Sequence, residues 1–153
     1  MTTSAEPTAR YIKALVFRMG EQEYCVDILR VREIRGWTPA TPLPHGPHFL
    51  RGVVNLRGVV LPVIDFSALL NCRPLEPNSR SAIIVLEYGG CLFGLLVDGV
   101  SDVLDIELDV IQPTPEIAST SEQFVTGIVA LEKRMISVVS LEHLATHGKR
   151  EAA

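Results

Sequence analysis

The stretch FLRGVVNLRGVVLPVID, residues 49–65, decides the fold class of this chain. Two apolar runs rich in β-branched residues, 52–56 and 59–65, flank the four residues Asn55-Leu56-Arg57-Gly58. Asn and Gly occupy the favoured ends of a type I turn, so the stretch predicts a β-hairpin with Arg57 at its tip. There the guanidinium projects into water and can pair with a partner's carboxylate, or it is an ordinary solvated charge.

The same pattern of strand, turn and strand recurs along the chain. It predicts hairpins from 12–19 with 23–28 around Gly20-Glu21, from 82–88 with 91–97 around Gly89-Gly90, and from 127–131 with 135–140 around Glu132-Lys133-Arg134. Residues 65–70 and 140–147 have the length and spacing of short helices. Short apolar runs separated by turn signals about every ten residues are typical of an all-β barrel or sandwich.

Comparison of the sequence with itself indicates a duplication. At an offset of 69 residues Gly20 matches Gly89 and Glu33 matches Asp102, and at an offset of 75 Gly52 matches Gly127. We interpret this as two repeats, about 11–71 and 80–147, joined by a linker with Pro74 and Pro77. Each repeat is too small to bury its apolar strands well alone, so the two are expected to share a core. Accidental similarity between β-rich segments is the alternative.

Composition excludes several functional classes. The chain has 153 residues, a formal charge of −4 and few consecutive basic residues, which disfavours nucleic acid as a partner. Its longest apolar runs, of about six residues, are far below the roughly 20 that cross a bilayer, so no direct membrane insertion is expected. Three cysteines without C-x-x-C spacing favour a reducing compartment, and residues 1–10 suggest a disordered leader. We therefore expect a cytoplasmic protein.

Motifs of enzyme chemistry are missing from the sequence. It contains no G-x-S-x-G, no phosphate-binding glycine loop and no metal-ligand set, so neither a catalytic residue, a metal nor a cofactor is predicted. The histidine pairs His45/His48 and His143/His147 offer too few ligands. Two alternatives stay open: a hydrolase in which His143 meets Ser137 or Ser140, and a β-barrel that senses a small ligand, although barrels this small are filled by side chains.

Three segments carry a resemblance to a known family. They are YCVDILRVREI (24–34), FLRGVVNLRG (49–58) and VDGVSDV (97–103), with the N-L-R-G hairpin followed by PVID (62–65) as the most specific. Together they resemble the CheW family of chemotaxis coupling proteins over about residues 11–145. Cys25 departs from the family, which usually has a very small residue there.

The resemblance implies a fold and a domain organisation. The fold is mainly β, with two small SH3-like five-stranded β-barrels packed together and a few short helices. The CheW-like domain would span residues 11–147, with the two repeats as its subdomains, and residues 148–153 would form a tail. The duplication agrees with one barrel for each repeat.

The resemblance also implies a non-enzymatic adaptor in bacterial chemotaxis signalling. Such a protein couples the cytoplasmic tip of methyl-accepting chemoreceptors to the regulatory domain of the histidine kinase CheA, and head-to-tail contacts with CheW-like neighbours would build rings. A CheW-like paralogue serving pili or surface sensing is the alternative within the family. The residues expected at partner contacts are Val31, Glu33, Arg51, Gly52, Arg57, Gly58, Val100 and Val103. Val31, Val100 and Val103 are expected to line a groove between the barrels that receives the receptor helix.

Overall fold

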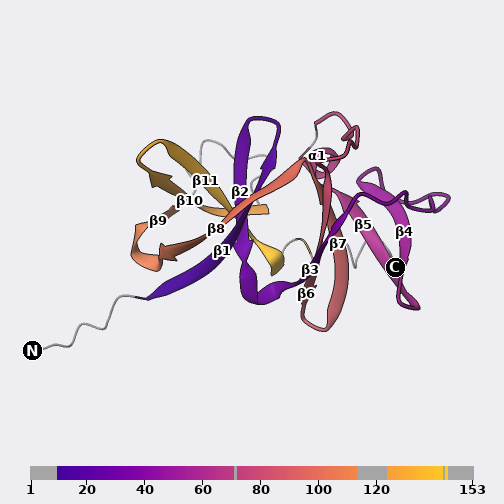
Figure 1. The fold of residues 1–153 in the computed structure, drawn as a ribbon, viewed down its shortest axis with the longest axis horizontal. Helices are drawn as coiled ribbons and strands as arrows, with labels where there is room; N and C mark the ends of the chain where they lie inside the picture. Colours follow the sequence, from indigo (N-terminus) through magenta and orange to yellow (C-terminus); the bar gives the residue numbers. More distant parts are fainter. Residues whose placement is uncertain (1–9, 71, 114–123, 143, 145–153) are drawn as a thin grey trace, which may run out of the picture.

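Two curved β-sheets lie side by side in the computed structural model, which describes residues 10–70, 72–113, 124–142 and 144 (Figure 1). The six-stranded sheet has the order β8-β1-β2-β11-β10-β9. Its strands are β1 (Tyr11–Met19), β2 (Gln22–Asp27), β8 (Gly99–Glu107), β9 (Ile111–Pro113), β10 (Val125–Leu131) and β11 (Arg134–Val139). The expected mainly β fold of two small SH3-like barrels is confirmed. The barrel formed by the six-stranded sheet has one strand more than the expected five, because the three residues of β9 pair with β10.

The second sheet has five strands in the order β3-β6-β7-β5-β4. They are β3 (Val31–Gly36), β4 (Leu50–Leu56), β5 (Val59–Asp65), β6 (Ala82–Tyr88) and β7 (Cys91–Val97). Three short helical segments, η2 (Ile28–Arg30), α1 (Phe66–Leu69) and η3 (Leu108–Val110), connect strands. The expected helix at 65–70 is therefore present. Of the helix expected at 140–147, half lies outside the described residues, and Leu141, Glu142 and Leu144 in the other half are helical. Residues 1–9 of the expected leader and the whole expected tail 148–153 also lie outside the described residues.

The two barrels do not coincide with the two predicted repeats. The first half of the chain contributes β1 and β2 to the six-stranded barrel and β3, β4 and β5 to the other, so each barrel combines strands from both halves. The halves exchange their first hairpins, β1–β2 for β6–β7. Each exchanged hairpin is held by a parallel strand pair. In the five-stranded barrel Val63 pairs with Gly94, and in the six-stranded barrel Val138 pairs with Cys25. The two pairs correspond, since Val138 matches Val63 at the offset of 75 and Gly94 matches Cys25 at the offset of 69.

All four expected hairpins form, and two of their turns differ from the prediction. Leu56 pairs with Val59, so Arg57 and Gly58 alone make the turn, with φ angles of 51° and 88°. Positive φ at both central residues is the type I′ geometry, not the expected type I. Its twist suits a two-residue hairpin. Arg134, expected in a turn, pairs with Leu131 and begins β11.

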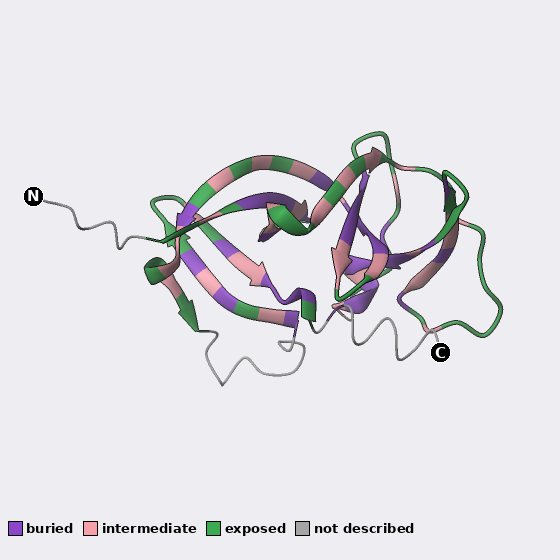
Figure 2. Ribbon diagram, turned by 90° about the horizontal axis from the view of Figure 1, so that it is seen from below, coloured by how far each residue is buried: buried purple, intermediate pink, exposed green. Residues whose placement is uncertain are grey.

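A single large apolar cluster joins the barrels, as the shared-core prediction required. Alternate residues of β1 explain this: Leu15 and Phe17 point into the shared cluster, whereas Ala14 and Val16 point into the interior of the six-stranded barrel. Figure 2 shows the alternation of burial as stripes along the strands. Cys25 is fully buried in the smaller cluster. Burial raises the pKa of its thiol to about 12, so this thiol is an inert packing group.

Candidate interaction surface

The eight residues expected at partner contacts fall on four parts of the fold. Val31 and Glu33 lie on β3, Arg51 and Gly52 lie on β4, and Arg57 and Gly58 form the tip of the β4–β5 hairpin. Val100 and Val103 lie on β8, in the other barrel. The set is therefore spread over both barrels.

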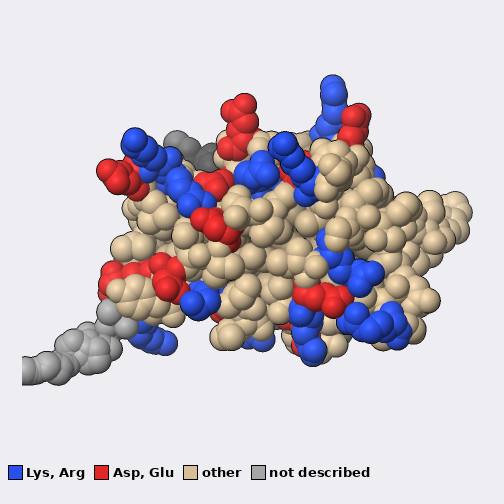
Figure 3. Space-filling view, viewed as in Figure 1, with Lys and Arg blue, Asp and Glu red and all other residues tan. Residues whose placement is uncertain are grey.

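Glu33 and Arg57 form an ion pair that connects β3 to the hairpin tip. Arg57 Nη2 donates to Glu33 Oε1 at 3.1 Å, and Arg35 Nη1 lies 3.4 Å from Glu33 Oε2. Since β3 and β4 are opposite edges of their sheet, this contact brings the two edges of the five-stranded barrel together. In Figure 3, acidic and basic side chains lie next to each other along the lower face of this barrel. The Arg57 side chain stays 71% exposed, so it can still meet a partner.

The same pair lowers the pKa of the Glu33 carboxyl, chiefly through the hydrogen bond from Arg57 and secondarily through Arg35. A lowered folded-state pKa means that the contribution of this pair to stability is present above the unfolded-state pKa and is lost as the pH falls through the folded-state pKa. We expect the side-chain carboxyl resonance of Glu33 to titrate below the ordinary glutamate range in an NMR pH titration. Arg57→Gln should move its midpoint upward. An unchanged midpoint in that variant would show that the ion pair does not form in solution.

Arg51 is engaged by its own chain. Its Nη1 donates to Asp65 Oδ2 at 3.3 Å and to the Leu75 carbonyl oxygen at 3.0 Å, and its guanidinium carbon lies 5.4 Å from the centre of the Trp37 ring. Asp65 is 1% exposed and also accepts hydrogen bonds from the backbone N–H groups of Ala68 and Leu75. Arg51 thus supplies the charge that a buried carboxylate requires.

Gly52 and Gly58 serve the backbone of the hairpin. Gly52 lies at a bulge where the β4–β5 register shifts, with φ of 143°, and an added Cβ would lie 2.2 Å from the carbonyl oxygen of Thr41. Gly58 has φ of 88° and donates its N–H to Asn55 Oδ1 at 2.7 Å. Both positions need glycine for reasons internal to the chain, and their contact with a partner stays a prediction.

The three valines differ in exposure. Val31 and Val100 are partly buried against the shared core, whereas Val103 is 46% exposed. Val31 and Val100 match each other at the offset of 69 residues, and they lie in different sheets, on β3 and β8. The expected groove between the barrels that these valines line stays a prediction.

One charged cluster was missed from the sequence. Arg134 makes two hydrogen bonds to the carboxylate of Glu23, at 2.9 and 2.8 Å, and two to that of Asp102, at 3.2 and 3.1 Å. These contacts raise the pKa of Arg134 and join β11 to β2 and β8. The match of Asp102 with Glu33 indicated the carboxylate but not its partner, because Arg57 matches Glu132, and not Arg134, at the offset of 75 residues.

Within the described residues, His, Cys, Asp and Glu side chains do not gather in any group of three that could hold a metal ion. None of the helices there is long and apolar enough to cross a membrane. Ser137 lies on β11 and Ser140 directly follows it, whereas His143, their partner in the hydrolase alternative, lies outside the described residues.

Comparison with known proteins gives a consistent result. The family model of the CheW-like domain matches residues 13–149. The chain is 50% identical to the chemotaxis protein CheW of Rhizobium meliloti, with all of both chains covered. It is 53% identical to a probable chemotaxis protein CheW of Rhizobium etli, over 91% of this chain and 90% of that one. The crystal structure of the scaffolding protein TtCheW from Thermoanaerobacter tengcongensis superimposes with a TM-score of 0.80 at 33% identity, covering 86% of this chain and 90% of that one. A match over nearly the whole length, in sequence and in fold, shows that this chain belongs to the CheW-like family.

Proposed function

We propose that this chain is a non-enzymatic, cytoplasmic adaptor that couples chemoreceptors to the histidine kinase CheA. The observation that carries the proposal is the full-length match at 50% identity to a protein named chemotaxis protein CheW, together with the likeness to a named scaffolding protein. A scaffold works through its outer surface, and the exposed side chains of this surface include Arg57 and Val103, both expected at partner contacts.

Apolar and charged side chains of this surface would have different roles in binding. Exposed apolar side chains such as Val103 would receive the apolar face of a receptor helix. The Glu33–Arg57 pair would set register and exclude wrong partners more than it adds affinity, as charges at the rim of an interface generally do. The two barrels present different faces, so contacts with CheA or with CheW-like neighbours are heterologous and can propagate into rings.

The alternative of a small-ligand sensor fits less well. The interior of the six-stranded barrel is filled by its own apolar side chains, which are at most 2% exposed: Ala14, Val16, Cys25, Ile106, Val129 and Ile136. A paralogue that serves pili or surface sensing would have the same architecture. The kinase that copurifies with the chain from its native cell distinguishes these two adaptor roles.

Val103→Asp tests the receptor contact. We expect capture of a receptor cytoplasmic-tip fragment to fall about tenfold or more, because the new carboxylate would be desolvated against an apolar helix face. The temperature of unfolding should stay nearly unchanged, since Val103 is 46% exposed. Binding to immobilised receptor fragment, with CheA regulatory domain as second ligand, measures both partners. Val100 is less suitable, because it packs on the shared core.

Val110→Asp is the matched control, since Val110 is also exposed, at 40%, but lies on η3. It should bind receptor like the unmodified protein. Equal binding by Val103→Asp and the unmodified protein would remove β8 from the receptor contact.

A further inference from the structure

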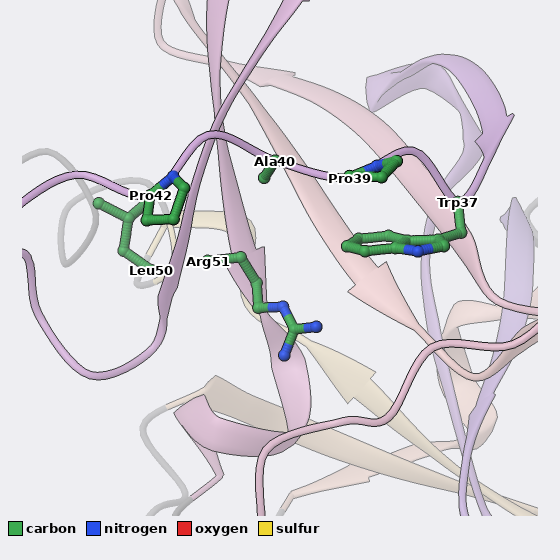
Figure 4. A pocket seen from close by; sticks show the side chains of 6 residues that line it. All are labelled: Trp37, Pro39, Ala40, Pro42, Leu50 and Arg51. Atoms are coloured by element: carbon green, nitrogen blue, oxygen red, sulfur yellow. The ribbon is translucent and has the colours of Figure 1, made fainter.

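A cavity of about 380 Å³ opens between β4 and the segment that follows β3 (Figure 4). Apolar groups and one guanidinium line it: Trp37, Pro39, Ala40, Pro42, Leu50 and Arg51. None of these residues belongs to the Glu33–Arg57 ion pair. Its volume falls within the range of pockets that hold small ligands or a few peptide atoms.

The walls of this cavity are held by the backbone of the barrel. Thr41 pairs with Val53, through N–H to carbonyl hydrogen bonds of 2.8 and 2.9 Å in the two directions. Gly52 permits this close approach, because a side chain there would collide with Thr41. The segment that carries Trp37, Pro39 and Pro42 is thus fastened to β4 beside the cavity.

Arg51 gives the cavity a polar end with unused donors. Its Nη1 is occupied by Asp65 and the Leu75 carbonyl, while Nε and Nη2 have no hydrogen-bond partner among the described residues. The side chain is 25% exposed and Asp65 only 1%, so an incoming group meets the guanidinium and not the carboxylate behind it. In Figure 4 the guanidinium lies between the Trp37 ring and the Pro42–Leu50 side of the cavity.

We propose that this cavity binds an acidic segment of a partner protein, with one glutamate or aspartate carboxylate on Arg51 Nε and Nη2. An apolar residue next to that acid would rest on Trp37 and on the Pro42–Leu50 wall. The chemistry favours a carboxylate because arginine offers paired N–H donors that match its two oxygens, and charge-assisted bonds are stronger than neutral ones. The apolar walls favour an apolar neighbour, because it buries surface there. This proposal does not depend on which kinase or receptor the adaptor meets.

Trp37 is the only tryptophan of the chain, so its fluorescence reports directly on the cavity. The full chain is titrated with acetyl-Pro-Leu-Glu-Leu-amide and, separately, with the same peptide carrying glutamine. We expect a saturable change with the glutamate peptide, weakening as salt is added, and about tenfold weaker binding of the glutamine peptide. Absence of a saturable change, or equal affinity for both peptides, would overturn the proposal.

Two variants keep the test independent of folding. Ala40→Phe fills the cavity while leaving Arg51 and Asp65 in place, and it should abolish the response. Arg51→Gln should lose the preference for glutamate. Because this change also leaves Asp65 without its cation, circular dichroism establishes that the variant is folded before binding is compared. Arg80→Gln, an exposed arginine away from the cavity, should bind like the unmodified protein. Unchanged binding by folded Ala40→Phe would place the peptide elsewhere and contradict the assignment.

Discussion

Gly52→Ala is expected to lower the free energy of unfolding by about 3 kcal/mol or more, since overpacking and backbone strain each cost about 1–3 kcal/mol. The added Cβ would lie 2.2 Å from the Thr41 carbonyl oxygen and 2.6 Å from its carbon, and both are backbone atoms that no side-chain rotation can move. The φ of 143° adds strain for any residue with a side chain. Urea unfolding followed by circular dichroism measures the loss.

Gly36→Ala is the control for this change. Gly36 is the last residue of β3, its φ is not in the left-handed region, and an added Cβ would meet nothing within 4 Å. Its effect should stay within about 0.5 kcal/mol, as for most surface substitutions. If Gly52→Ala were as stable as Gly36→Ala, the close approach of Thr41 to β4 would not exist in solution.

Arg57→Glu is expected to weaken binding to the receptor, to CheA or to both about tenfold or more, with the fold intact. The change removes the exposed cation and sets two carboxylates side by side at the hairpin tip, where Arg57 now lies 3.1 Å from Glu33. Charge reversal at an interface both removes an attraction and adds a repulsion. Stability should change by less than about 1 kcal/mol, since an exposed ion pair contributes little. Surface-immobilised binding and circular dichroism measure the two effects.

Two companion variants separate the roles of Arg57. Lys133→Glu reverses a charge at the equivalent tip of the β10–β11 hairpin and should leave binding unchanged if the effect is local. Glu33→Arg combined with Arg57→Glu restores the ion pair with inverted polarity. Recovery of binding in that double variant would assign Arg57 to holding the tip in place, whereas continued loss would assign it to the partner contact. Unchanged affinity of Arg57→Glu for both partners would remove it from the interface.

Local features of the fold were predictable because they depend on neighbours in sequence. The alternation of apolar residues and the Gly89-Gly90 pair place strands and turns correctly, since strand period and turn chemistry act over a few residues. The turn at Arg57 was predicted as type I because Asn55 and Gly58 suit that geometry. The twist of the paired strands selected type I′ instead, and strand twist is a property of the sheet.

For the candidate site, too, single residues were predictable from the sequence, whereas the contacts between them were not. Glu33 and Arg57 were identified individually, but their pairing across 24 residues follows from the curvature that joins β3 to the tip. Arg51 was expected to face a partner, whereas folding gives its Nη1 to Asp65 and Leu75. The Arg134 cluster was missed because Glu23 lies 111 residues away in sequence. No local pattern encodes such a contact.

The amino-acid sequence by itself determined the mainly β class and the four hairpins, because these depend on residue spacing along one strand or turn. It also determined the family, because the characteristic segments occur in order along nearly the whole chain. Only the tertiary structure decided that the halves of the chain exchange their first hairpins, so that each barrel combines strands from both halves. The physical reason is that exchanged and unexchanged pairings of equivalent strands satisfy the same local hydrogen-bonding and apolar patterns. Which pairing forms depends on the short connections and on the shared core between the barrels, and these act only once distant segments have met.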